Sequence, residues 1–416
     1  MRKTVLMVID GLRGDTPVAQ WMPSLARVAD NACVFSAHRG VFPSATRVSS
    51  ASLSTGCWPA THGLPGNSIA LRDGDGYINV SAGSAEFAQQ FRAARGQVLD
   101  VPTLADRLGE RMLIVSNSSA GAAHMQDPNK RARLMHRSGS WFPGGVPSTG
   151  TEGLEITYDG TGDAVATQRF CEALVHTPAA LSLLWICEPD HSQHVNALGG
   201  PDHRAMLAGS DRMVAQVAAT VARLRDAGEE VLFIVTSDHG HETTDEVIDV
   251  TGALVDAGFK AALESKELVV ASSGMGGLIY AMDESVEFVT RLGDWMNAQL
   301  WCHQCWSGPR LGEVGQRATQ GIVAAFSMAR RDVPNAHGVM GLAHTMKDPF
   351  MPYDGAGQGQ HGGFGPYEGS PLLLVDGGGF ARGVRTDASR IIDLAPTVLD
   401  YFGESSAGMD GQPLVR

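Results

Sequence analysis

The chain has 416 residues, which is enough to bury a large core and fits one domain with an insertion, or two domains. Its 32 Lys and Arg against 45 Asp and Glu give a formal charge of −13, which argues against sequence-independent binding of duplex nucleic acid. No apolar run approaches the roughly 20 residues of a membrane-spanning helix, so we expect no membrane partner.

The chain begins with a short apolar run, residues 4–9, which ends at Asp10 without a small-residue cleavage signal. This pattern predicts a buried strand rather than a signal peptide. Because six cysteines are scattered along a chain without an export signal, we expect reduced thiols and a cytoplasmic protein.

Four further apolar runs predict strands, at residues 111–116, 181–187, 230–236 and 371–375. Apolar side chains also recur at helical spacing before Gly228 and predict a helix packed on the sheet: Met213, Val214, Val217, Val221 and Leu224. This alternation predicts an α/β fold with a mainly parallel central sheet, flanked by helices on both faces.

Two stretches break the alternation. Residues 250–351 carry clustered tryptophans and Gly-rich turns, and we interpret them as a smaller cap domain inserted over the site. The catalytic core would then comprise residues 1–249 and 352–416. Residues 117–160 are rich in Gly, Ser and Pro, and this composition predicts long surface loops.

Within the proposed cap, Cys302 and Cys305 have the spacing of half a zinc knuckle or of a redox motif. No second CxxC pair in the sequence completes a four-ligand site. We therefore predict a structural role for these two cysteines.

Candidate metal ligands follow the predicted strands. Asp10, Asp190, Asp238 and His239 each come at or just after the carboxyl end of a strand, which is the edge where open α/β sheets bind ligands. Zinc favours carboxylate oxygen and histidine nitrogen, and a catalytic zinc keeps one position open. The placement of these residues therefore predicts a metal site at this edge.

Two further histidines could join this site. His194 lies four residues after Asp190, and His361 lies in a Gly-rich loop at residues 357–363. Either histidine, taken alone, is more often a hydrogen-bonded structural residue than a ligand.

The stretch 42–56 is rich in hydroxyl groups and should form a loop that enters a helix. A hydroxyl at a helix N-terminus lies beside backbone N–H groups that suit a phosphoryl oxygen. Thr46 could equally act as the N-cap of this helix, which is the commoner role for such a residue. The local sequence leaves both roles open.

Taken together, these motifs resemble the alkaline phosphatase superfamily, and within it the type I phosphodiesterase and nucleotide pyrophosphatase branch that also contains phosphonoacetate hydrolase. The matching elements occur in the family's order: Asp10-Gly11, Thr46, Thr55-Gly56, the Pro-x-x-His-Gly at 59–63, Pro189-Asp190 with His194, Ser237 to Gly240, His361-Gly362, the stretch 393–399 and Met409-Asp410-Gly411. The resemblance covers the chain from Asp10 to Gly411, except for the proposed cap and residues 117–160.

The resemblance implies an alkaline-phosphatase-like fold and two zinc ions per chain, although Mn²⁺ or Fe could replace zinc. One ion would be held by Asp190, His194 and His361, and the other by Asp10, Asp238, His239 and the oxygen of Thr46. Zinc-activated Thr46 would attack phosphorus and form a phosphothreonine, which water then hydrolyses. Asn67 would donate to a non-bridging phosphoryl oxygen, unless it only forms a turn.

Other polar residues are expected outside the ligand set. We predict that His62 is structural and that His191 and His241 act as partners of ligands. In the proposed cap, solvated loops are expected for His337, His344 and Lys347, although they could touch substrate.

At the position directly after the nucleophile, the family's diesterases have an aromatic or another uncharged residue, whereas this chain has Arg47. Its guanidinium could clamp a phosphoryl group or a substrate carboxylate, or it could point outward. Phosphonoacetate hydrolase grips its substrate's carboxylate with lysines from a separate loop. Lys130, Arg131 and Arg133 are the candidates here, without a secure alignment.

We predict a zinc-dependent hydrolase of phosphorus esters, of phosphodiesterase or nucleotide pyrophosphatase type, that acts on a small phosphorus-containing substrate and could form a homodimer. The alternatives are hydrolysis of a phosphonate C–P bond, which Arg47 favours, and phosphomonoester hydrolysis. A sulfatase is disfavoured because Thr46 is not in a Cys/Ser-x-Pro-x-Arg motif. A catalytically inactive scaffold would be expected to have lost a ligand, and all are present.

Overall fold

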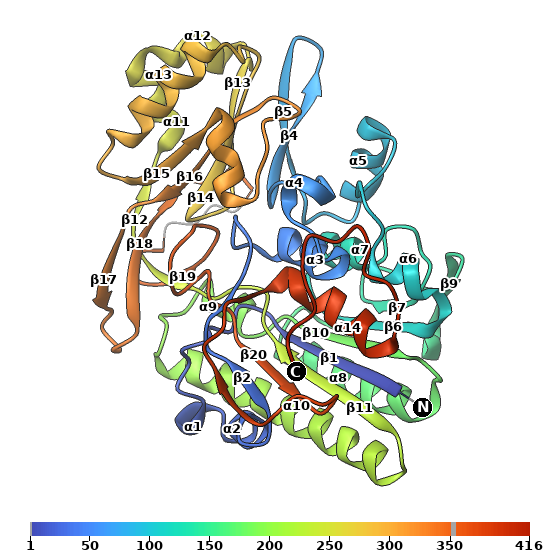
Figure 1. Ribbon diagram of the computed structural model, residues 1–416. Coiled ribbons are helices and arrows are strands. Elements are labelled where there is room, and N and C mark those ends of the chain that lie inside the picture. Colours follow the sequence, from blue (N-terminus) through green and yellow to red (C-terminus); the bar gives the residue numbers. More distant parts are fainter. Residues whose placement is uncertain (1, 351–354) are drawn as a thin grey trace.

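The centre of the molecule is a ten-stranded mixed sheet, in the order β21-β2-β20-β11-β1-β10-β6-β7-β8-β9 (Figure 1). The computed structural model describes residues 2–350 and 355–416. Five neighbouring strands run parallel: β11 (Glu230–Thr236), β1 (Arg2–Ile9), β10 (Leu181–Ile186), β6 (Met112–Ser116) and β7 (Arg133–His136). The predicted mainly parallel α/β fold is therefore confirmed at the core of the sheet.

Antiparallel pairs occur toward both edges of this sheet. On one side β20 (Leu373–Asp376) runs antiparallel to β11 and to β2 (Cys33–Phe35), and β21 (Gly383–Arg385) runs parallel to β2. On the other side β8 (Ser140–Phe142) and β9 (Val146–Ser148) continue antiparallel from β7. All five strands predicted from apolar runs lie in this sheet, as β1, β6, β10, β11 and β20.

Helices cover both faces of the sheet because side chains of a strand point alternately to either face. Met7 of β1 packs with the face covered by α2 (Pro23–Ala29), α8 (Gly160–His176) and α10 (Pro201–Asp226). Leu6 and Val8 pack with the opposite face, under α3 (Thr46–Thr55), α6 (Leu104–Leu108) and α14 (Leu394–Phe402). The predicted helix before Gly228 is α10.

The prediction of long loops for residues 117–160 is wrong. This stretch contains α7 (Ala120–Gln126) and the strands β7, β8 and β9, and it buries Leu134 and Trp141 in the main core. Strands of three or four residues between Gly-rich turns are too short to show the alternation that identifies longer strands.

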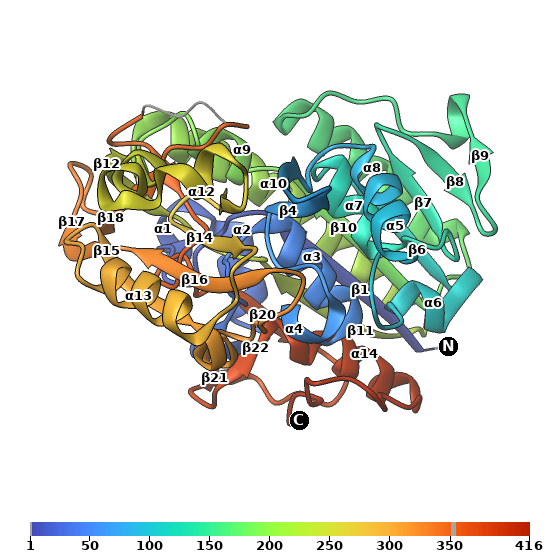
Figure 2. The same cartoon turned by 90° about the horizontal axis from the view of Figure 1, so that it is seen from above.

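A smaller antiparallel sheet lies within the predicted cap, in the order β13-β14-β16-β15. Its strands are β13 (Leu268–Ser272), β14 (Gly276–Ala281), β16 (Ile322–Met328) and β15 (Cys302–Ser307). Together with α11 (Val250–Leu254), α12 (Lys260–Glu264) and α13 (Val286–Asn297), they form an apolar cluster of their own. Figure 2 shows this sheet and α13 at the opposite end of the molecule from β8 and β9.

A third sheet, in the order β17-β18-β12-β19, joins residues from both sides of the predicted cap boundaries. It contains β17 (Arg330–Pro334), β18 (Met340–Met346), β12 (Glu242–Ile248) and β19 (Gly359–Gln360). The predicted boundary at residue 351 lies outside the described residues, and the division into core and cap stays a prediction.

The remaining short elements connect these layers. They are α1 (Val18–Trp21), β3 (His38–Arg39), α4 (Pro59–His62), β4 (Ser68–Asp73), β5 (Gly76–Ser81), α5 (Phe87–Arg95), α9 (Asp190–Gln193) and β22 (Ser389–Arg390). Over residues 2–350 and 355–416, no helix has both the length and the apolar character needed to span a membrane.

Candidate active site

The carboxyl ends of three neighbouring strands form the floor of the site. Asp10 follows β1, Asp190 follows β10 and opens α9, and Asp238 follows β11. Because these strands are adjacent and parallel, with Ile9 paired to Ile186, their carboxyl ends meet at one edge of the sheet. All three carboxylates are buried there.

One group of side chains surrounds Asp190. Its Oδ1 lies 2.8 Å from His241 Nε2, 3.5 Å from His194 Nε2 and 3.6 Å from His361 Nε2. The candidate ligand atoms of these four residues all lie within 4.8 Å of one another. His361 reaches this group because it directly follows β19, which pairs with β12 just after the Asp238-His239 turn.

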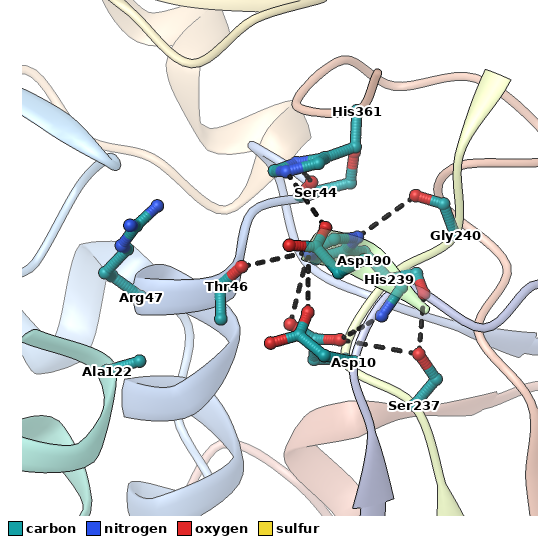
Figure 3. A network of polar contacts seen from close by, with 12 residues as sticks. Asp10, Ser44, Thr46, Arg47, Ala122, Asp190, Ser237, His239, Gly240 and His361 are labelled. Atoms are coloured by element: carbon teal, nitrogen blue, oxygen red, sulfur yellow. Dashed lines mark hydrogen bonds and ion pairs between the residues drawn. The ribbon is translucent and has the colours of Figure 1, made fainter. Parts of the chain in front are cut away.

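A second group surrounds His239. Its Nε2 lies 3.5 Å from Asp10 Oδ1, 3.2 Å from Asp238 Oδ2 and 3.1 Å from Thr46 Oγ1 (Figure 3). Asp190 connects the two groups, because its Oδ1 also lies 3.9 Å from His239 Nε2. The structure thus brings together the six side chains predicted as ligands, and Thr46.

The unpaired atoms of this cluster fit divalent cations. Asp10 Oδ1 and Asp238 Oδ2 are buried and have no hydrogen-bond partner. His239 Nδ1 donates to the Gly240 carbonyl at 3.0 Å and His361 Nδ1 to the Ser44 carbonyl at 2.8 Å. Each Nε2 therefore keeps its lone pair facing the cluster, which is the arrangement typical of metal-binding histidines. The mixture of imidazole and carboxylate suits zinc and related divalent metals.

The buried carboxylates repel one another without a cation. Burial raises the pKa of Asp10, and the nearby Asp238 and Asp190 raise it further. Burial likewise raises the pKa of Asp238. Burial opposes ionisation of Asp190 too, but His194 and His241 outweigh it and hold the pKa of Asp190 well below its usual value. Bound cations would offset this repulsion, as the largest local charges of the site.

Thr46 is the first residue of α3, and Ala45 is the N-cap. The N-cap role for Thr46 is therefore wrong. The hydroxyl of Thr46 instead contacts His239, at the near end of the cluster.

A buried glutamate ties the segment before Thr46 to the His361 loop. Glu368 accepts the N–H groups of Gly363 at 2.8 Å and Gly365 at 3.0 Å, and the Ser44 hydroxyl at 3.1 Å. Burial and the neighbouring Glu242 raise the pKa of Glu368 to about 8. Sequence reasoning missed this residue, because no motif marks it and its partners lie in other segments.

A cavity of about 450 Å³ opens over the cluster, and Thr46, Arg47 and Asn67 all line it. Asn67 Oδ1 accepts the backbone N–H of Arg47 at 3.1 Å, so its Nδ2 is free to donate to a bound molecule. In Figure 3 the Arg47 side chain lies beyond Thr46 and does not reach the cluster.

The sequence model of the type I phosphodiesterase / nucleotide pyrophosphatase family matches residues 4–294, a range that contains every predicted ligand except His361. The chain belongs to this family. Its members are phosphodiesterase hydrolases of the alkaline phosphatase superfamily, which confirms the resemblance seen in the motifs. Among curated proteins, no sequence matches the chain.

Solved structures show the same fold at low sequence identity. An inactive form of murine ectonucleotide pyrophosphatase / phosphodiesterase 5 in complex with AMP gives a TM-score of 0.67 at 15% identity, over 99% of this chain and 98% of that chain. Another structure of the murine protein gives a TM-score of 0.65 at 16% identity, over 99% of this chain and 98% of that chain. The human protein gives 0.65 at 14% identity, over 99% and 97%.

Three histidines of this chain lie outside the predicted ligand set, and their surroundings differ from one another. His241 is fully buried, and its Nε2 contacts Asp190 within the ligand cluster itself. His191 lines the cavity and packs against the ring of Tyr158. His62 contacts the Ser52 hydroxyl through Nε2 and is buried away from the cavity lining.

Several other candidates lie away from the cavity. Lys130 lies over the ring of Trp141, Arg131 lies 3.9 Å from Asp106, and Arg133 pairs with Glu152. None of these three basic residues lines the cavity, and the same is true of the cap residues His337, His344 and Lys347. The basic loop considered as a carboxylate clamp is therefore not part of this site.

The cysteines of the CxxC pair belong to the apolar cluster of the smaller sheet. Cys302 and Cys305 are buried on β15, and burial raises the pKa of both thiols. Among the described residues, neither cysteine is part of a group that could hold a metal ion.

Proposed function

We propose that this chain is a zinc-dependent hydrolase of phosphorus esters, of the phosphodiesterase or nucleotide pyrophosphatase type, which works through a phosphothreonine intermediate. One observation carries the proposal: the Thr46 hydroxyl lies 3.1 Å from His239 Nε2, at the junction of the ligand cluster and the cavity. A nucleophile needs this combination of an activating neighbour and an accessible substrate space.

The metal assignment follows the two groups of side chains. Asp190, His194 and His361 would hold one zinc ion, and Asp10, Asp238 and His239 the other, beside the Thr46 oxygen. When bound, two such cations supply positive charge to the attacking and leaving oxygens of an in-line displacement and lower the pKa of a coordinated hydroxyl.

The chain's own residues then carry out a double displacement. The Thr46 Oγ1 forms a bond to phosphorus while the bond to the leaving oxygen breaks, and the leaving oxygen gains a proton. Asn67 Nδ2 donates to a non-bridging oxygen, where negative charge develops in the transition state. A water oxygen next attacks phosphorus, and the Thr46 oxygen regains its proton as the phosphothreonine is hydrolysed.

Hydrolysis of a phosphonate C–P bond is the second candidate. The observation that favours it is Arg47, a cation in the cavity where the family's diesterases have an uncharged residue. The carboxylate clamp suggested around Lys130 does not support this candidate, because those residues lie outside the cavity lining.

A parallel assay of the zinc-loaded protein tests the proposal. A nitrophenyl nucleotide diester, a nitrophenyl monoester and phosphonoacetate would be compared by kcat/KM, because specificity lies in that ratio. We expect the diester to be preferred. Preference for phosphonoacetate would select the second candidate, and an inactive zinc-loaded protein would refute both.

A further inference from the structure

The guanidinium of Arg47 has no partner in the described part of the chain. Its Nε is buried without a hydrogen bond, and neither an ion pair nor a side-chain hydrogen bond is formed by the other guanidinium nitrogens. A buried donor such as this Nε–H is costly when it is left without an acceptor, since it has lost water without a replacement. This cost suggests that a ligand supplies the missing acceptor.

The position of Arg47 excludes the metal cluster as that acceptor. Arg47 follows Thr46 on α3, and successive side chains of a helix point in different directions. Thr46 therefore faces His239, while Arg47 lies on the far side of Thr46 from the cluster (Figure 3). A molecule bound in the cavity can therefore contact Thr46 and Arg47 from different sides.

The cavity wall is shaped to make room for this guanidinium. A Cβ at Gly83 would lie 2.6 Å from Arg47 Nη2, so a side chain there would have to displace the guanidinium. The backbone of Gly83 does not have a positive φ, so its conformation gives no other reason for glycine here. Gly83 also lines the cavity.

The cavity-lining residues around Arg47 include three uncharged polar side chains. Ser81, Ser119 and Asn67 line this side, and the Asn67 oxygen is already bound to the Arg47 N–H. Asp348 also lines the cavity, but its carboxylate accepts the N–H of Phe350. An incoming anionic group would thus meet a guanidinium that forms no ion pair with the described residues.

We propose that Arg47 determines substrate specificity by binding a second anionic group, a carboxylate or a phosphate, on the part of the substrate beyond the scissile bond. The inference rests on the proposed function, since it places the reacting phosphorus at Thr46. A planar guanidinium can bind either anion through two parallel N–H···O bonds. Diesters with an anionic second arm are then better substrates than diesters with an uncharged arm.

The test uses three nitrophenyl phosphodiesters that differ only in the second arm. The arm is ethyl in one, ends in a carboxylate in another and ends in a phosphate in the third. For the zinc-loaded protein, we expect each anionic arm to raise kcat/KM at least about tenfold over the ethyl arm. This factor corresponds to the strength of charge-assisted hydrogen bonds. The preferred arm identifies which anion the site takes.

Substitutions then assign the preference to Arg47. Arg47→Gln should lower the ratio of kcat/KM for anionic over uncharged arms by about 10- to 100-fold, and Arg47→Lys by less. Gly83→Ala should lower the same ratio, because it pushes the guanidinium aside. The matched control is Arg382→Gln, an exposed residue outside the cavity lining, which should leave the ratio unchanged.

The outcomes separate this inference from the proposed function. An unchanged ratio in both Arg47→Gln and Gly83→Ala, in folded protein with normal zinc content, would overturn the role of Arg47. No turnover of any of the three diesters by the zinc-loaded wild-type protein would instead overturn the proposed diesterase activity.

Discussion

Two walls of the same cavity differ in how firmly their side chains are held. On the strand-end wall, which the ligand cluster forms, five of the six predicted ligands have a further contact: Asp10 with Trp185, Asp238 with the Gly11 N–H, Asp190 with His241, His239 with the Gly240 carbonyl and His361 with the Ser44 carbonyl. The exception among the described residues is His194, whose Nδ1 is buried without a hydrogen bond. On the outer wall, which we define by Arg47 and Gly83, the charged group has no such contact.

This difference separates reaction chemistry from substrate selection. Groups that stabilise a transition state work best when they are fixed before the substrate arrives, because no reorganisation is then needed. A group that selects substrates discriminates most strongly when it is unpaired in the free protein, because the wrong substrate leaves it without a partner. The predictions below test whether the strand-end wall carries the chemistry.

Loss of the nucleophile should have the largest effect. Thr46→Ala removes the oxygen that forms the bond to phosphorus, and we expect kcat to fall at least about 10⁴-fold. Zinc content should stay near that of the wild type, because six other ligands remain. Thr46→Ser keeps a hydroxyl and is the matched control, with partial activity. Full activity of Thr46→Ala would return Thr46 to a structural role.

Removal of the metal should abolish turnover and also weaken the fold. Without cations, the buried Asp10, Asp190 and Asp238 repel one another. A metal that binds only the folded state stabilises it, by about 4 kcal/mol at a thousand times its Kd. We expect chelation to lower both activity and Tm, and added zinc to restore both. A chelated protein that keeps its activity and Tm would contradict the metal assignment.

Substitution of Asn67 should have an intermediate effect. Asn67→Ala removes an amide that is oriented by the Arg47 N–H, and the loss of one such donor costs about 10²- to 10³-fold in kcat. The effect should appear in kcat rather than in KM, since the donated bond strengthens as charge develops. Asn67→Asp, which keeps the shape but replaces the donor, should be no better than Asn67→Ala. Equal kcat for Asn67→Ala and the wild type would make Asn67 a turn former only.

Glu368 offers a test of how the strand-end wall is held. Its folded pKa of about 8 exceeds the usual 4.5, so its protonated form contributes stability that is full at low pH and is lost as pH rises toward 8. Glu368→Gln cannot ionise and should show a flatter decline of Tm between pH 5 and 8. We expect kcat to fall roughly tenfold, because Ser44 and the His361 loop lose a shared anchor. Parallel curves of Tm against pH for the two proteins would refute the contribution of protonated Glu368 to stability.

The CxxC pair should have the smallest effect on the site. Because Cys302 and Cys305 lie in the apolar cluster of the smaller sheet, Cys302→Ala and Cys305→Ala should cost about 1 kcal/mol of stability each. Zinc per chain and kcat should be unchanged, and elemental analysis with the diester assay measures both. A loss of bound zinc would show that the cysteines are ligands.

The sequence predicted the parts of the molecule that depend on local patterns. Runs such as residues 181–187 are buried on both sides of the sheet, so their apolar character persists in any context. The short strands of residues 133–148 carry no such pattern, because a strand of three or four residues at a sheet edge is defined by its neighbours. For the same reason the composition of residues 117–160 predicted loops where the fold has strands.

By itself, the sequence determined that Asp10, Asp190 and Asp238 follow the carboxyl ends of strands, because the apolar runs before them predict strands, and this is the edge where α/β sheets bind ligands. Only the tertiary structure decided that His241 joins the cluster, that Glu368 anchors it and that Arg47 lies beyond Thr46 without a partner among the described residues (Figure 3). These three features depend on side-chain direction and on contacts between segments that are far apart in the chain. Side-chain direction and contacts between distant segments do not follow from spacing along the sequence.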